Sequence, residues 1–202
     1  LPLLSWNDPG VMEARGKVTL DKEAAIADLD LQLALGNLAT ARPRYLTGFL
    51  APAGFPDLLL TGKLDAGLRL RAGALAGMTA SFDQVNAIDD KARFTIAGVN
   101  GDLAWTRDAT AVESQVAWAS GALYGIGLGP ARVAFRSAGG ELRLQAPVAI
   151  EVLAGKITLE HLRWQAPKAG GGATFQFGLG MDQLDLASLS QRLGWPPFTG
   201  TI

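Results

Sequence analysis

Strict alternation of apolar and polar residues runs through most of this 202-residue chain and is clearest between residues 63 and 72. In that stretch Leu68 and Leu70 fall on one parity, whereas Arg69 and Arg71 fall on the other. Successive side chains of a β-strand point to opposite faces of the sheet, so this pattern predicts a strand with one apolar and one polar face. Antiparallel sheets of this kind commonly cover one face and leave the other in water.

The same alternation recurs along the chain and predicts a mainly β protein. The joints between the alternating stretches are short and contain glycine, as β-hairpins require. Asn100-Gly101 gives the strongest single turn signal. We expect strands over residues 11–20, 26–35, 58–72, 75–85, 91–98, 102–106 and 112–119, and around residues 133–135, 142–144, 157–159 and 175–179.

Two stretches have helical spacing instead. Residues 42–50 carry Pro43, which suits a first helical turn, and an apolar spacing of three to four residues. Residues 185–193 begin with Asp185 as a candidate N-cap and are followed by Gly194 as a candidate C-cap. We therefore expect only two short helices.

Composition limits the partners that this chain can have. The formal net charge is −1 and no basic stripe is present, so nucleic acid is not an expected partner. The apolar fraction is 49%, yet the sequence contains no apolar run of about 18 residues that would suit a transmembrane helix. Cysteine is absent, which excludes disulfides, thiolate metal sites and cysteine nucleophiles.

A distant internal repeat is visible near the C-terminus. Residues 194–200 (GWPPFTG) echo residues 54–62 (GFPDLLLTG), and in both places a strand and a short helix come first. We interpret residues 1–202 as a single segment of a longer β-array protein. One approximate repeat covers residues 54–193, and the next unit starts at residue 194.

No constellation of residues indicates catalysis, so we expect a protein that is not an enzyme and uses no metal or cofactor. The only histidine, His161, has no second imidazole with which to share a metal, and we interpret it as a surface residue. We interpret the pair Asp89-Asp90 as part of a solvated turn, and Asp28 and Asp30 as part of a polar strand face. The glycines of residues 125–129 lack a following helix and indicate a kinked strand or bulge.

What covers the apolar face is left open by these patterns. A second sheet packed on it would make a β-sandwich, in which the same side chains form a closed core. A long, strongly curved antiparallel sheet would instead leave its apolar face partly open as a groove. Aliphatic side chains suit both arrangements because they make no directional bonds.

Three segments carry a resemblance to a known family: residues 60–70 (LTGKLDAGLRL), 90–105 (DKARFTIAGVNGDLAW) and 186–200 (LASLSQRLGWPPFTG). Their residue pattern, which extends over most of the chain, resembles that of the AsmA/TamB superfamily of Gram-negative envelope proteins. It is most similar to the YdbH-like branch, whose domain also carries a "dicarboxylate transport" label. The type II secretion N protein shares the same style of sheet.

This resemblance implies a repeating β-groove, or β-taco, built on a long curved antiparallel sheet. It implies a periplasmic protein, anchored in the inner membrane, that carries phospholipid or another acyl-chain lipid to the outer membrane. Neighbouring repeats of the same chain and other envelope proteins are the implied partners, and the family has no catalytic residues to carry over. The alternative is a β-sandwich-like structural or interaction module of an envelope or secretion complex.

The apolar parity of the expected strands supplies the residues that would line such a groove. They are Leu64, Leu68, Leu70, Met78, Phe82, Phe94, Ile96, Leu142, Leu144, Ile157, Leu159, Phe175 and Phe177. Lys63, Arg69, Arg71 and Arg93 are expected on the opposite face.

Overall fold

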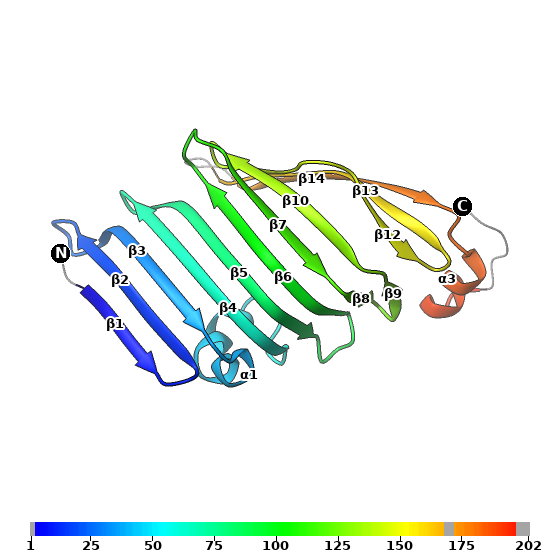
Figure 1. Cartoon of the computed structure of the whole chain (residues 1–202), viewed down its shortest axis with the longest axis horizontal. Helices are drawn as coiled ribbons and strands as arrows, with labels where there is room; N and C mark the ends of the chain where they lie inside the picture. Colours follow the sequence, from blue (N-terminus) through cyan, green and yellow to red (C-terminus); the bar gives the residue numbers. More distant parts are fainter. Residues whose placement is uncertain (1–2, 168–171, 197–202) are drawn as a thin grey trace.

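A computed structural model describes residues 3–167 and 172–196 of the chain. Its strands all belong to one long, open, antiparallel sheet of 14 strands, which confirms the mainly β prediction (Figure 1). The strands are β1 (Leu3–Asp8), β2 (Met12–Leu20), β3 (Ile26–Leu35), β4 (Leu59–Arg71), β5 (Ala74–Ile88), β6 (Phe94–Thr106), β7 (Val112–Trp118), β8 (Ser120–Leu123), β9 (Ile126–Leu128), β10 (Ala131–Ala138), β11 (Glu141–Leu144), β12 (Val148–Val152), β13 (Gly155–Gln165) and β14 (Thr174–Asp182).

Strand order largely follows the sequence, so the sheet is a meander. It runs β1-β2-β3-β4-β5-β6-β7-β10, continues through β11 to β13, and places β12 and β14 beside β13. The short strands β8 and β9 form a hairpin in which β8 pairs with β6. Within the described residues, β1, β9, β12 and β14 each pair with one strand only, and β1 and β14 lie at opposite ends of the sheet.

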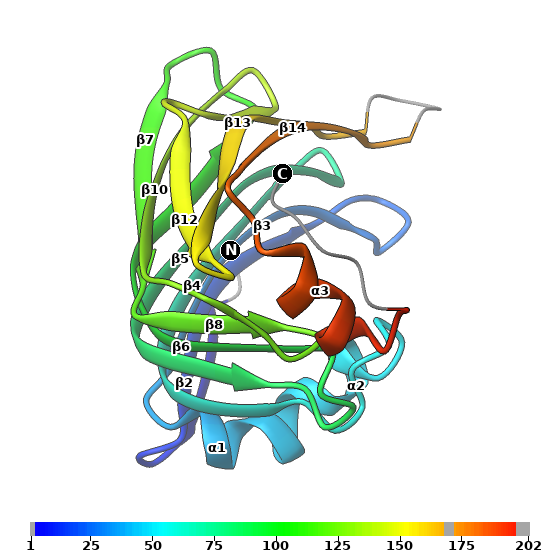
Figure 2. The same cartoon turned by 90° about the vertical axis from the view of Figure 1, so that its right-hand side faces the viewer.

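The sheet bends along a line of irregularities that crosses neighbouring strands. Strand β5 carries an extra residue near Gln84 and β6 carries one near Gly98, both at positive φ. Ala119 separates β7 from β8. Because bulges bend a strand and increase its twist, this succession accounts for the curvature of the sheet, with helix α3 (Leu186–Leu193) on its concave side (Figure 2).

A helical crossover between β3 and β4 supplies the best-buried part of the molecule. It comprises α1 (Leu38–Ala41), a π-helical turn η1 (Arg42–Leu46) and α2 (Thr47–Leu50). Leu38 and Ala41 pack with Leu35, Val85 and Val99 in a small closed core at one end of the strands. No described helix has both the length and the apolar character needed to cross a membrane.

The two helical regions appear where the sequence indicates them, but one boundary is different. Helix α3 has the predicted caps: Asp185 accepts bonds from the N–H groups of Ala187 and Ser188, and Gly194 adopts a left-handed conformation. The first region begins at Leu38 instead of residue 42, because Asn37 caps it by accepting a bond from the Thr40 N–H. Pro43 therefore lies inside the crossover.

The expected turn at Asn100-Gly101 is wrong, because both residues lie in the middle of β6. Gly101 has φ +110°, and a Cβ there would lie 2.2 Å from the carbonyl oxygen of Gln115 on β7. The glycine therefore permits a close approach of two strands and does not reverse the chain. Strands β1, β8 and β12 are absent from the sequence prediction, whereas β9 lies in the glycine-containing stretch 125–129, where a kinked strand or bulge was expected. The expected loop at residues 168–172 lies almost entirely outside the described residues.

Candidate functional site

The strand register places the predicted groove residues on one face of the sheet. Leu64 lies opposite Phe82, and Leu68 lies opposite Met78, across the β4–β5 pair. Farther along the sheet the same face carries these predicted residues with their cross-strand partners: Leu144 opposite Phe135, Leu142 opposite Trp164, Phe175 opposite Trp164, Phe177 opposite Leu162, Leu159 opposite Leu179, and Ile157 opposite Met181 and Ile150. We call this surface the apolar face.

The bulges keep the apolar face continuous. Between Phe82 and Ala87, β5 contains one residue more than the stretch of β4 with which it pairs. This extra residue places Ala87 on the same face as Leu60 and Leu64. Strand β6 gains the matching residue near Gly98, so Ile96 lies opposite Ala87. Leu60, Leu64, Phe82 and Ile96 accordingly pack around the same small core.

Most of the apolar face is only half covered. Leu64, Leu68 and Leu70 are half-buried, and Met78 keeps 38% of its surface exposed. On β14, at the edge of the sheet, Phe175 and Phe177 are 56% and 55% exposed. A contiguous apolar surface left this open is typical of a site that binds an apolar ligand or another protein.

Two tryptophans on the apolar face were missed by the sequence analysis. Trp105 lies opposite Met78, and its ring meets Trp164 edge-to-face at 5.6 Å between centroids. Its indole N–H donates to the carbonyl oxygen of Gly140 at 3.0 Å, so the ring is both buried and hydrogen-bonded. The alternation of residues 102–106 could have placed Trp105 on this face, because Trp105 lies two residues from the apolar Leu103 and therefore shares its face.

Polar contacts fasten the crossover over the β1 end of the apolar face. The carboxylate of Asp8 accepts bonds from the Tyr45 hydroxyl at 2.8 Å and from the Arg44 guanidinium at 2.7 Å. These two donors hold the pKa of Asp8 below its ordinary value, the Tyr45 bond having the larger effect. Arg42 also donates to the carbonyl oxygen of Pro56 within the crossover.

A buried ion pair fastens the other end of the crossover and corrects the interpretation of Asp89. Asp89 is 2% exposed and pairs with Arg93, which donates from Nε at 2.8 Å and from Nη2 at 2.6 Å. These bonds lower the pKa of Asp89 to about 2. Arg93 also donates to the carbonyl oxygen of Gly54 and lies over the Phe55 ring, which Phe94 meets edge-to-face. Arg93 therefore binds the crossover and does not lie with the polar strand residues.

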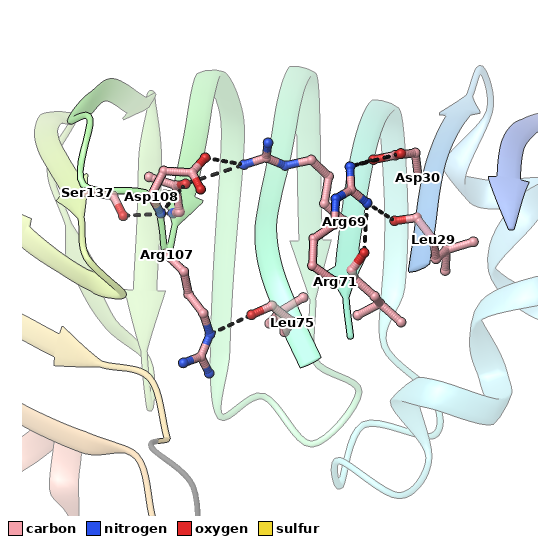
Figure 3. Close-up of polar contacts among 10 residues, drawn as sticks. Leu29, Asp30, Arg69, Arg71, Leu75, Arg107, Asp108 and Ser137 are labelled. Carbon is pink, nitrogen blue, oxygen red and sulfur yellow. Dashed lines mark hydrogen bonds and ion pairs between the residues drawn. The ribbon is translucent and has the colours of Figure 1, made fainter. Parts of the chain in front are cut away.

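The opposite face of the sheet is polar and is crossed by ion pairs between strands (Figure 3). Arg69 on β4 pairs with Asp108 at 3.0 Å and Arg71 pairs with Asp30 at 2.7 Å. The Arg69 bond lowers the pKa of Asp108, and the Asp30 bond raises the pKa of Arg71. Lys63 also lies on this face, paired with Asp83.

No group of three or more histidine, aspartate or glutamate side chains suited to a metal occurs among the described residues. His161 lies exposed at a bulge of β13 opposite Gly178. Searches among protein-family models, curated proteins and solved structures found no match to this chain.

Proposed function

We propose that this chain binds the acyl chains of a lipid, most simply a phospholipid, along its apolar face and forms part of a path for lipid transfer. The observation that carries the proposal is the continuity of a half-covered apolar surface from β1 to β14 in a single curved sheet. The closed core around Leu38 and Ala41 covers only the part of this face near Leu64, Phe82 and Ile96, whereas Met78, Phe175 and Phe177 remain exposed.

The energetics of acyl-chain burial support a mobile ligand. Each buried methylene contributes about 0.8 kcal/mol, so full burial of a chain of roughly sixteen carbons would contribute on the order of 12 kcal/mol. An open face shields only part of the chain and gives a smaller gain. The aliphatic lining lacks directional bonds, and the lipid therefore meets low barriers as it moves from strand to strand.

The resemblance to the AsmA/TamB superfamily supports a location for this activity. The proposed localisation is the periplasm of a Gram-negative envelope, in a protein anchored in the inner membrane. Lipid would pass between the inner and outer membranes along neighbouring repeats of the same chain, with other envelope proteins as further partners.

Photo-crosslinking tests the proposal directly. A photoreactive amino acid at Leu68, on the apolar face, is expected to capture lipid from phospholipid vesicles or from cells. The matched control is the same amino acid at Thr79, which is exposed on the neighbouring strand but points to the polar face. Native mass spectrometry of the purified chain identifies any lipid that remains bound.

A folded chain that captures no lipid at Leu68, or captures equal amounts at both positions, contradicts lipid binding by the apolar face. That result would favour the other candidate, a structural or interaction module of an envelope or secretion complex. In such a module the apolar face is covered by protein.

A further inference from the structure

Three arginines on the polar face differ from the other arginines that the structure describes in having no partner. Among the arginines whose side chains the structure describes, only Arg132, Arg136 and Arg143 make no hydrogen bond, ion pair or ring contact. All three are exposed and lie on adjacent strands, two on β10 and one on β11. The pattern is local, since Arg69 and Arg71 on the same face both have aspartate partners.

The sheet holds two of these cations directly side by side. Arg136 lies opposite Arg143, and Arg143 lies opposite Arg163, so three guanidinium groups form a row across β10, β11 and β13. Side chains directly opposite in an antiparallel pair have Cβ atoms about 4.5–5.5 Å apart, and like charges at this distance are destabilising. A hollow of about 250 Å³ lies between Arg136, Ala138, Glu141 and Arg143.

Nearby carboxylates only partly balance the row. Glu141 is bound to Arg163, and Glu113 lies opposite Arg136 on β7 without reaching ion-pair distance. With Arg132 on the same strand face, the four positive charges of the arginines exceed the two negative charges of the glutamates. A chain whose formal net charge is −1 thus concentrates an excess of positive charge at one place.

We propose that Arg136 and Arg143, with Arg163 beside them, form a binding site for a phosphate group. The planar guanidinium fork suits bidentate bonds to phosphate oxygens, and a dianion between two neighbouring forks removes the repulsion between them. The site lies on the face opposite the proposed lipid surface. The phosphate site can therefore be confirmed or refuted independently of the proposed function.

Calorimetric titration of the complete chain with inorganic phosphate and with pyrophosphate, at low ionic strength, tests the site. Saturable binding is expected, and Arg143→Gln and Arg136→Gln are each expected to weaken it about tenfold, as the loss of a charge-assisted hydrogen bond implies. Arg15→Gln is the matched control, because Arg15 is an exposed arginine on the same face that already pairs with Glu13.

Vesicle flotation distinguishes a free phosphate from a lipid headgroup as the source. Phosphatidylcholine vesicles with and without phosphatidic acid are compared for the wild type and Arg143→Gln. If Arg143→Gln loses flotation only with the vesicles that contain phosphatidic acid, the ligand is a lipid headgroup. If the wild type binds inorganic phosphate but Arg143→Gln floats as well as the wild type, the ligand is a soluble phosphate. Without phosphate, Arg143→Gln is expected to melt at or above the wild-type temperature, since it removes a like-charge pair. Absence of saturable phosphate binding together with no effect of Arg143→Gln on flotation, or an equal loss in Arg15→Gln, overturns the proposal.

Discussion

Leu38 and Leu68 are the same residue type in two different environments. Leu38 is 1% exposed in the closed core, whereas Leu68 is half-buried on the apolar face. Leu38→Ala is expected to lower the free energy of unfolding by about 2–5 kcal/mol, as truncation in a tight core does. Leu68→Ala is expected to lower it by about 1–2 kcal/mol, because part of the side chain is already in water. Urea denaturation of both variants measures the difference, and equal losses would mean that the apolar face is a closed core.

The buried pair of Asp89 and Arg93 gives stability a defined pH dependence. The folded pKa of Asp89 is about 2, below its ordinary value of 3.8. A depressed carboxyl pKa stabilises the fold above the ordinary value, and this contribution disappears as the pH falls from about 4 to 2. Asp89→Asn is therefore expected to melt below the wild type at neutral pH, with a difference that narrows toward pH 2.

Asp90→Asn is the matched control for this pH dependence. Asp90 adjoins Asp89 in sequence but is exposed. Thermal melts of the wild type and both variants between pH 7 and pH 2 provide the measurement. A gap between wild type and Asp89→Asn that is independent of pH would show that the ion pair does not account for the stability.

At the scale of the elements, the line of bulges sets the curvature of the sheet. Gly101 lies on β6 beside this line, and a Cβ there would be 2.2 Å from a β7 carbonyl oxygen. Gly101→Ala is expected to cost at least about 1–3 kcal/mol, because φ is +110° and β7 would have to move. Gly127→Ala in β9, where no atom lies within 4 Å of the new Cβ, is expected to be nearly neutral. Chemical denaturation compares the two, and a neutral Gly101→Ala would show that this close approach is dispensable.

The same elements show what local sequence can and cannot predict. Helix α3 was predicted with both caps, because capping depends on residues within one or two turns. Asn100-Gly101 was misassigned, because the need for glycine there comes from the close approach of the neighbouring strand β7, a tertiary contact that local sequence does not reveal. The interpretation of Asp89 as a solvated residue was wrong for a similar reason. Its partner Arg93 contacts Gly54 and Phe55, which are distant in sequence. The apolar face itself was predictable, because alternation alone decides which side chains share a face.

At the scale of the whole molecule, a charge on the apolar face separates an open surface from a closed one. Leu70 lies half-buried in β4, opposite Leu29 and Leu75 on its two neighbouring strands. If this face is open, the carboxylate of Leu70→Asp can reach water, and the variant is expected to stay folded with a modestly lower melting temperature. An unpaired charge in a closed core would instead cost several kcal/mol and unfold the chain.

The lipid-binding consequence of Leu70→Asp follows from the same geometry. An acyl chain that covers the new carboxylate would have to remove it from water, which costs free energy, so photo-capture of lipid at Leu68 is expected to fall strongly while the fold remains. Thr79→Asp adds the same charge on the polar face and is expected to leave lipid capture unchanged. Circular dichroism establishes that both variants are folded before their capture is compared. A folded Leu70→Asp variant that captures lipid as well as Thr79→Asp would show that lipid does not travel over this part of the sheet.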